Sequence, residues 1–219
     1  PMAELIISGP AGRIEARYTP APGENPPIAL ILHPHPKAGG TMQDPVTITL
    51  FELFSAHGFS TMRFNFRGVG RSQGQFDAGV AELSDAAYVL DHLESLNESP
   101  SQCWVAGSSF GAYICLQLLM RRPEIAGFVA VAPPANHYDL SFLAPCPASG
   151  IIISGDKDFS QLIGPTVRVI DTMRDITYDE ELVRKKWGVR PNQFVDLLAI
   201  MGDDIDNIPG VKGIGQKGA

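Results

Sequence analysis

A serine flanked by glycines is the first feature of this 219-residue chain that suits catalysis. It lies in Gly107-Ser108-Ser109-Phe110-Gly111, between a predicted strand and a predicted helix. In a G-x-S-x-G turn of this kind the glycines permit close packing, so the serine hydroxyl projects from the surface. The next backbone N–H then faces an oxyanion developing on a bound acyl group. We therefore predict Ser109 as a nucleophile and the backbone N–H of Phe110 as an oxyanion donor.

Two carboxylates at the end of an apolar run are the second feature. Residues 151–153 are three consecutive isoleucines, which predict a short strand buried on both faces of a parallel sheet. Ser154 and Gly155 then end the strand, and Asp156 and Asp158 follow at its C-terminal end. In open α/β sheets that end carries ligands and chemistry. An acid in this place suits two different reactions, and these residues alone leave both open.

The elements that must position these residues alternate between strand and helix. The predicted strands are 3–8, 12–18, 28–32, 59–66, 103–106, 128–132, 151–153 and 167–170. The predicted helices are 45–57, 79–96, 110–121, 158–163, 179–187 and 191–201. Such alternation is typical of the α/β class with a doubly wound, mainly parallel sheet.

Three motifs follow one another in the N-terminal two thirds of the chain. They are His33-Pro34-His35-Pro36 with Gly39-Gly40-Thr41-Met42, then Phe64-Asn65-Phe66-Arg67-Gly68-Val69-Gly70-Arg71-Ser72, then the turn around Ser109. In this order they resemble the α/β-hydrolase superfamily, and most nearly the small dienelactone-hydrolase-like esterases, from about residue 3 to residue 155. The resemblance implies a Ser, Asp, His triad in that chain order. Ser109 matches the nucleophile and Asp158 the acid, with Asp156 as the rival.

The histidine that this resemblance implies is missing. It should follow the acid after one further strand, but no histidine occurs beyond His137. We expect all five histidines to be structural: His33, His35, His57, His92 and His137. A serine hydroxyl without a general base is a poor nucleophile at neutral pH.

The last third of the chain carries a different set of motifs. They include Ser154-Gly155-Asp156-Lys157-Asp158-Phe159-Ser160-Gln161-Leu162, Val183-Arg184-Lys185-Lys186-Trp187-Gly188-Val189 and Gly202-Asp203-Asp204-Ile205-Asp206-Asn207-Ile208-Pro209-Gly210. From about residue 151 to residue 219 the chain resembles the 5′-nuclease domain of bacterial DNA polymerase I, a flap-endonuclease-like domain. The N-terminal half of that domain, with its own acids and basic arch, has no counterpart here.

The nuclease resemblance implies a metal site and a DNA-binding tail. Clustered carboxylates in that family hold two divalent metals that position a phosphodiester and activate water. The matching residues are Asp156, Asp158, Asp203 and Asp206, whose hard oxygen ligands suit Mg²⁺ or Mn²⁺. The tail resembles the hairpin of a helix-hairpin-helix, whose amides approach DNA phosphates and whose carbonyls hold a monovalent cation. Its residues are Gly210, Val211, Lys212, Gly213, Ile214 and Gly215.

The two resemblances meet at one strand. We predict a hydrolase-like part at 1–150 and a nuclease-like part at 151–219, joined as a chimera. The truncated hydrolase sheet would be completed by a nuclease-derived strand and a helical appendage, as one continuous sheet. We expect no efficient catalysis and no required cofactor. The alternatives are a weak serine esterase that uses Ser109, and a divalent-metal- and DNA-binding module.

Composition limits the partners. Hydrophobic residues make up 44% of the chain and the net charge is −7, so the chain can bury a core and has no basic field that would attract nucleic acid. DNA binding through the tail should therefore be weak. Three cysteines without metal-ligand spacing indicate reduced thiols and a cytoplasmic protein, and no apolar run is long enough for a membrane span. The oligomeric state is open, with a dimer through the truncated sheet edge as one outcome.

Overall fold

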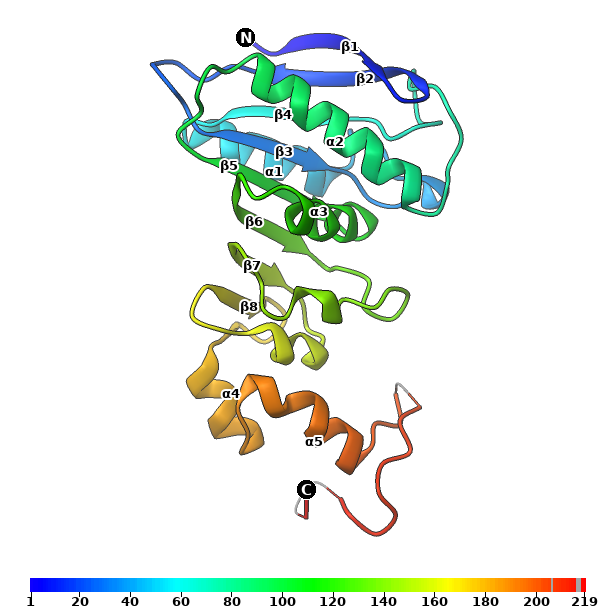
Figure 1. Cartoon of the computed structure of the whole chain (residues 1–219), viewed down its shortest axis with the longest axis vertical. Coiled ribbons are helices and arrows are strands. Elements are labelled where there is room, and N and C mark those ends of the chain that lie inside the picture. The colour runs from blue at the N-terminus through cyan, green and yellow to red at the C-terminus, as the bar shows by residue number, and fades with distance from the viewer. Residues whose placement is uncertain (206, 216–217) are drawn as a thin grey trace. The chain divides into compact units, whose positions relative to one another are not determined.

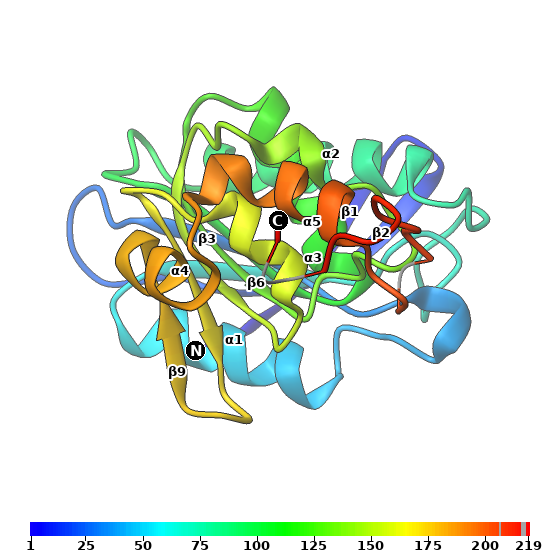
Figure 2. The ribbon, with the colours of Figure 1, turned by 90° about the horizontal axis from the view of Figure 1, so that it is seen from below.

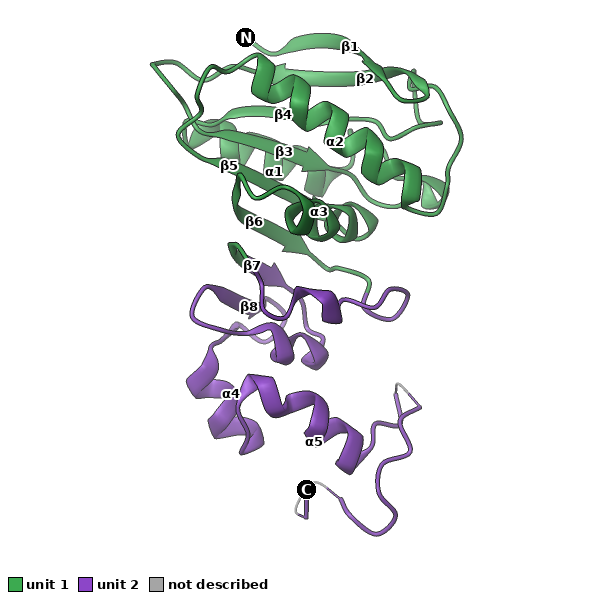
Figure 3. Ribbon diagram, in the orientation of Figure 1, with its two compact units in different colours: residues 1–134, 147–150 green, residues 135–146, 151–219 purple. Residues whose placement is uncertain are grey.

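The computed structural model describes residues 1–205, 207–215 and 218–219. The chain divides into two units, coloured separately in Figure 3. Unit 1 consists of residues 1–134 and 147–150, and unit 2 of residues 135–146 and 151–219. Figure 1 labels the elements of both.

Unit 1 is built around a six-stranded section of sheet. Its strands are β1 (Ala3–Gly9), β2 (Gly12–Thr19), β3 (Ile28–Leu32), β4 (Ser60–Phe64), β5 (Cys103–Ser108) and β6 (Ile125–Val131). They lie in the order β1-β2-β4-β3-β5-β6. The β1–β2 and β2–β4 pairs are antiparallel, whereas β4–β3, β3–β5 and β5–β6 are parallel. The predicted α/β class with a mainly parallel sheet is confirmed.

Helices cover both faces of this sheet, which explains why the central strand β3 is apolar throughout. They are α1 (Pro45–Ala56), α2 (Val80–Ser95) and α3 (Phe110–Arg121), with the 3₁₀ turn η1 (Pro36–Ala38). Figure 2 shows α1 on one face and α2 and α3 on the other. All five residues of β3 and all five of β4 are buried. A strand covered on both faces reads as a continuous apolar run rather than an alternating one.

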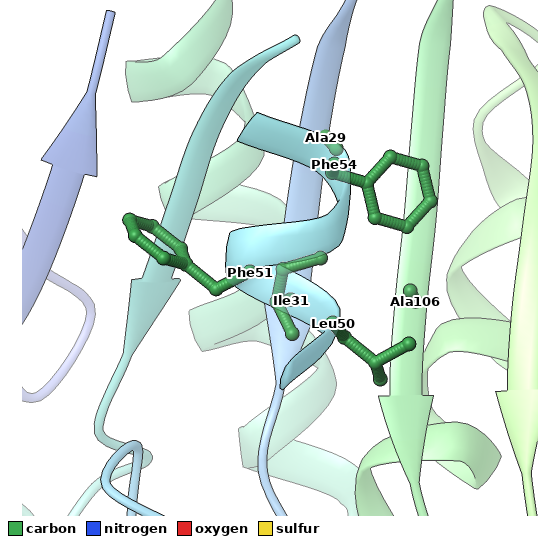
Figure 4. Packing of buried hydrophobic residues seen from close by; sticks show 6 residues of the cluster. All are labelled: Ala29, Ile31, Leu50, Phe51, Phe54 and Ala106. Carbon is green, nitrogen blue, oxygen red and sulfur yellow. The ribbon is translucent and has the colours of Figure 1, made fainter. Parts of the chain in front are cut away.

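The face under α1 shows how the residues fit together. Ala29 and Ile31 of β3 and Ala106 of β5 meet Leu50, Phe51 and Phe54 of α1, as drawn in Figure 4. The Phe54 ring also lies edge-on to Phe59, with ring centroids 5.0 Å apart. The alanines leave room for the phenylalanine rings, so the helix can pack closely on the strands.

A side-chain cap fixes the start of α1, and an ion pair fixes α2. Asp44 Oδ1 accepts from the backbone N–H of Val46 at 3.0 Å and begins α1. Arg67, in the loop after β4, forms two hydrogen bonds of 2.7 and 2.8 Å with the buried carboxylate of Asp85 on α2. This bidentate pair joins the loop to the helix in a defined orientation.

Unit 2 contains a β-hairpin followed by two short helices. Its elements are η2 (Ser141–Leu143), η3 (Lys157–Leu162), β8 (Val167–Asp171), β9 (Ile176–Tyr178), α4 (Glu180–Trp187), η4 (Pro191–Gln193) and α5 (Phe194–Met201). β8 and β9 pair antiparallel. Phe194, Leu197 and Leu198 form a small core, against which Trp187 packs.

β7 (Ser149–Ile153) contains the unit boundary, which falls after Gly150. The prediction of a strand at 151–153 is confirmed, but the prediction that it is buried on both faces is wrong. Ile152 is 0% exposed, whereas Ile151 is 36% exposed, because successive side chains point to opposite faces and only that of Ile152 is covered. The proposed continuity of one sheet across this strand stays a prediction.

Three further elements differ from their predictions. The segment predicted as a helix at 158–163 is the 3₁₀ turn η3, and the helix predicted at 191–201 divides into η4 and α5. The short strand β9 was not predicted. Among residues 1–205, 207–215 and 218–219, no helix combines the length and the apolar composition needed to cross a bilayer.

Candidate functional site

Ser109 occupies a strained turn between β5 and α3. Its φ and ψ are 52° and −121°, a combination that costs free energy for a residue other than glycine. The backbone holds it there: the Ser109 N–H donates to Val131 O at 2.8 Å, and Ser109 O accepts from the Tyr113 N–H at 3.1 Å. The hydroxyl-bearing residue is therefore fixed at the carboxyl end of β5, as the sequence predicted.

The flanking glycines are required by close backbone approach. A Cβ atom at Gly107 would lie 2.6 Å from the carbonyl carbon of Gly111, closer than such atoms approach in proteins. A Cβ atom at Gly111 would lie 2.5 Å from His33 O, in the loop after β3. The two glycines thus allow the turn, the start of α3 and that loop to pack against one another.

Phe110 begins α3, and its backbone N–H is the predicted oxyanion donor. The side chain is 1% exposed. Its ring lies among those of Phe66, Phe76 and His35, with centroid distances of 5.5, 5.7 and 5.1 Å. This aromatic packing fixes the first turn of the helix behind Ser109.

The loop after β3, predicted to contribute to an oxyanion site, is held by His33 and Asn65. The His33 ring accepts from the Phe66 N–H through Nε2 at 3.0 Å, so Nδ1 carries the proton that is donated to Pro34 O at 2.7 Å. Asn65 Oδ1 accepts from the Met42 N–H at 2.8 Å, at the other end of the loop. The loop is therefore anchored at both ends to residues that follow β4.

Three of the four histidines of unit 1, His33, His35 and His57, are engaged in such structural contacts. Burial lowers the pKa of His33 from 6.5 to about 4, so the ring is neutral at neutral pH. His35 Nδ1 accepts from the Lys37 N–H at 3.1 Å, and His57 Nδ1 lies 2.8 Å from Leu53 O. No histidine of unit 1 is hydrogen-bonded to Ser109.

The predicted acids lie in unit 2, around η3. Asp156 Oδ1 accepts from the Asp158 N–H at 2.9 Å and caps this turn. Asp203, which is 8% exposed, forms an ion pair with Lys157 and accepts from the Ile205 N–H through Oδ1 at 3.1 Å. Lys157 is thus paired with Asp203, one of the predicted metal ligands.

The predicted metal site is not assembled within the described part of the chain. Residues 1–205, 207–215 and 218–219 contain no group of three His, Cys, Asp or Glu side chains placed to hold a metal ion. Asp206, the fourth predicted ligand, lies outside the described residues. Metal binding by Asp156, Asp158, Asp203 and Asp206 therefore stays a prediction.

The predicted DNA-binding tail forms a turn. Val211 N–H donates to Ile200 O at 2.8 Å, and Ile214 N–H donates to Val211 O at 3.0 Å. Gly210 and Gly213 have φ values of 65° and 86°, which glycine adopts without strain. Lys212 is exposed between them. DNA binding and monovalent-cation binding at Gly210–Gly215 stay predictions.

Sequence reasoning missed a pocket of about 470 Å³ in unit 2. Its lining includes Lys157, Arg174, Tyr178, Lys186 and Trp187. The signal was present in the sequence as a Lys-Trp pair at the end of a predicted helix. Nothing in that pattern shows that Tyr178 and Arg174, from the preceding hairpin, line the same pocket.

Comparison with known proteins assigns the two parts of the chain to different families. The family model described as serine aminopeptidase, S33, matches residues 39–169. The model described as 5′-3′ exonuclease, C-terminal SAM fold, matches residues 189–219. Both resemblances expected from the motifs are confirmed.

Individual relatives show the same division. The uncharacterized protein RP471 of Rickettsia prowazekii is 49% identical over 160 residues, which cover 72% of this chain and 67% of RP471. The crystal structure of ATU1826 from Agrobacterium tumefaciens, of unknown function and described as an α/β hydrolase candidate, is 60% identical, with a TM-score of 0.67 and 69% of each chain covered. DNA polymerase I of Bacillus caldotenax is 53% identical over 72 residues, which are 31% of this chain and 8% of the polymerase.

Proposed function

Because this chain belongs to the α/β-hydrolase family described as serine aminopeptidase, S33, we propose that it is a serine-hydrolase scaffold without efficient catalysis. One observation carries the proposal. Ser109 has the strained turn geometry of a nucleophile, yet no histidine of unit 1 is hydrogen-bonded to it and no histidine follows His137 in these 219 residues.

The chain lacks a histidine base that would activate the Ser109 hydroxyl. A serine hydroxyl attacks a carbonyl at neutral pH only when an adjacent base accepts its proton. In serine hydrolases the loss of one triad member lowers turnover by about 10⁴-fold or more. The acid predicted at Asp158, with Asp156 as its rival, has no histidine to orient and no separate catalytic role in this scheme.

The alternative is a weak esterase that uses Ser109. The anchored loop after β3 and the buried ring of Phe110 support it, because they hold the backbone on both sides of the predicted oxyanion site. Oxyanion donors and substrate binding alone retain on the order of 10³-fold acceleration over water. A weak activity of this size would still depend on Ser109.

The experiment is a comparison of ester turnover. Hydrolysis of a short activated ester is measured for the parent chain, for Ser109→Ala and for Ser101→Ala, which removes an exposed serine outside the turn. The proposal predicts that all three chains hydrolyse the ester at nearly the background rate. A robust rate that disappears only in Ser109→Ala would overturn it, since another residue would then supply the base.

For unit 2, we propose weak DNA binding through the backbone amides of Gly210–Gly215. The exonuclease family model, which covers residues 189–219, and the exposed Lys212 support it. Because few cations contribute, the affinity should be low and should decrease modestly with salt. Titration of a duplex at low and moderate salt tests this, and an affinity independent of salt would contradict it.

The origin of the chain as a chimera is part of the same proposal. Two unrelated family models match its two parts. Each parent places a parallel strand before a Gly-Asp-x-Asp sequence, so a junction near Ile151 would preserve that strand for both. We propose that the nuclease-like segment replaces the last strands and the histidine of the hydrolase.

A further inference from the structure

The pocket of about 470 Å³ in unit 2 has the volume of a small-molecule site. Its lining brings together three cationic side chains, Lys157, Arg174 and Lys186, and the rings of Tyr178 and Trp187. All of these residues belong to unit 2. A ligand of this pocket would therefore be bound independently of Ser109.

Lys186 brings a positive charge to the pocket without a carboxylate partner. Its Nζ donates to the Tyr178 hydroxyl at 2.8 Å and lies 4.8 Å from the Tyr178 ring and 5.1 Å from the Trp187 ring. Within the described residues no Asp or Glu forms an ion pair with Lys186. Aromatic faces stabilise an ammonium but leave its charge in place, so the group favours an anion.

The Trp187 ring lines the pocket beside Lys186, with the Lys186 Nζ 5.1 Å from the ring centroid. Its indole Nε1 is buried and has no hydrogen-bond partner among the described residues. A ligand oxygen could accept a hydrogen bond from this atom only if the atom were accessible, so the N–H lies out of reach of a ligand in the pocket. Trp187 therefore contributes an aromatic surface to the pocket, and Lys186 contributes the positive charge.

The other two cations are held in place by carboxylates. Arg174 Nη1 lies 2.6 Å from Asp171 Oδ2, and Lys157 forms the ion pair with Asp203. A guanidinium fixed at one nitrogen presents its other N–H groups in a defined direction. Asp156 is the one carboxylate among the residues that line the pocket, and it would oppose an anion.

We propose that this pocket binds a small phosphate group, either free phosphate or the terminal phosphate of a monoester. A phosphate monoester carries about −1.5 to −2 charges and three strong acceptor oxygens. These oxygens match the ammonium group of Lys186 and the oriented cations Lys157 and Arg174. The rings of Tyr178 and Trp187 offer a surface for the organic part of a monoester.

Calorimetric titration of the full chain at low salt, with a chelator present, tests the proposal. The ligands are inorganic phosphate, adenosine 5′-monophosphate and adenosine. We expect both phosphate-bearing ligands to bind and adenosine not to bind. Comparable affinities would indicate free phosphate as the ligand, and a tighter monophosphate would indicate a monoester. Absence of heat with both phosphates at millimolar concentration would overturn the proposal, as would equal affinity for adenosine.

Variants distinguish this pocket from general electrostatic attraction. Lys186→Met keeps the aliphatic stem and should weaken binding at least tenfold, whereas Lys185→Met, at an exposed neighbour that does not line the pocket, should leave it unchanged. Trp187→Phe keeps an aromatic ring beside Lys186 and should leave phosphate binding nearly unchanged. Equal losses in Lys185→Met and Lys186→Met would contradict the proposal.

Asp156→Asn separates direct binding from binding through a metal. If phosphate contacts the cations directly, removal of the opposing carboxylate should tighten binding, and the chelator should have no effect. Binding that requires Mg²⁺ and is lost in Asp156→Asn would overturn the proposal in favour of a metal-bridged site. Tighter binding of an oligonucleotide without terminal phosphates would overturn it in favour of a nucleic-acid surface.

Discussion

In unit 1, Ser109 is held through its backbone, whereas His33 is held through its side-chain ring. Ser109 has a positive φ of 52°, and the surrounding backbone hydrogen bonds hold it in that conformation. The His33 ring is buried and joins Phe66 to Pro34 through its two nitrogens. A ring that uses both nitrogens for the backbone is unavailable as a general base, so the only fully buried histidine of unit 1 supports the loop rather than the nucleophile.

The lowered pKa of His33 predicts how stability depends on pH. Burial, opposed by Pro34 O and Asp44, lowers this pKa from 6.5 to about 4. Between these values the unfolded chain binds a proton that the folded chain does not, so stability is full above pH 6.5 and decreases down to about pH 4. The difference between the two pKa values corresponds to a loss on the order of 3 kcal/mol.

Urea unfolding at several pH values checks this prediction. The parent chain should lose stability below pH 6.5, and His33→Gln, although less stable, should lack this part of the pH dependence. His92→Gln, which changes a half-buried helix residue, should keep it. An identical pH dependence in the parent and His33→Gln would show that another group causes the loss.

Among the elements, β7 is the strand that contains the boundary between the two units. Ile152 is fully buried and Ile151 is 36% exposed. We expect Ile152→Ala to lower the free energy of unfolding by about 2–5 kcal/mol, as for buried aliphatic residues in general. The matched variant Ile151→Ala removes the same atoms from the exposed face and should cost less than about 1 kcal/mol. Equal losses in urea unfolding would mean that the two faces are equally buried.

The elements that the sequence predicted well are those whose pattern depends on burial. β3 is a continuous apolar run and α3 is largely apolar, and the predicted boundaries of both match the structure. β9 was missed because three residues are too few for an alternating pattern to be recognised. The helix predicted from residue 191 begins instead with a 3₁₀ turn, since Pro191 fixes the backbone there.

The same contrast holds for the candidate functional residues, some of which could be predicted from the sequence and some of which could not. Ser109 could be predicted, because the glycines at 107 and 111 are needed within a single turn. The pocket in unit 2 could not, because Arg174, Tyr178 and Lys186 meet only after β9 and α4 have folded. Local motifs reveal local geometry, whereas contacts between successive elements require the structure.

At the scale of the whole molecule, continuity of the sheet across the two units is a prediction that two tryptophans can test. Trp104 lies in unit 1 and Trp187 in unit 2. Trp187→Phe leaves Trp104 as the fluorescent reporter of unit 1. Trp104→Phe leaves Trp187 as the reporter of unit 2. If one sheet joins the units, the two urea transitions should coincide with each other and with circular dichroism. Clearly separated midpoints would mean that the units fold independently.

The pH dependence of covalent labelling at Ser109 shows whether this nucleophile has a base. A fluorophosphonate reacts with the parent chain and with Ser109→Ala between about pH 6 and 9, and mass spectrometry measures the rate at residue 109. Without a histidine base the reaction depends on hydroxide, so the rate should be slow and rise about tenfold per pH unit without a plateau. A fast rate at Ser109 that levels off above a midpoint of about pH 6.5, the ordinary pKa of histidine, would show that a histidine serves as its base.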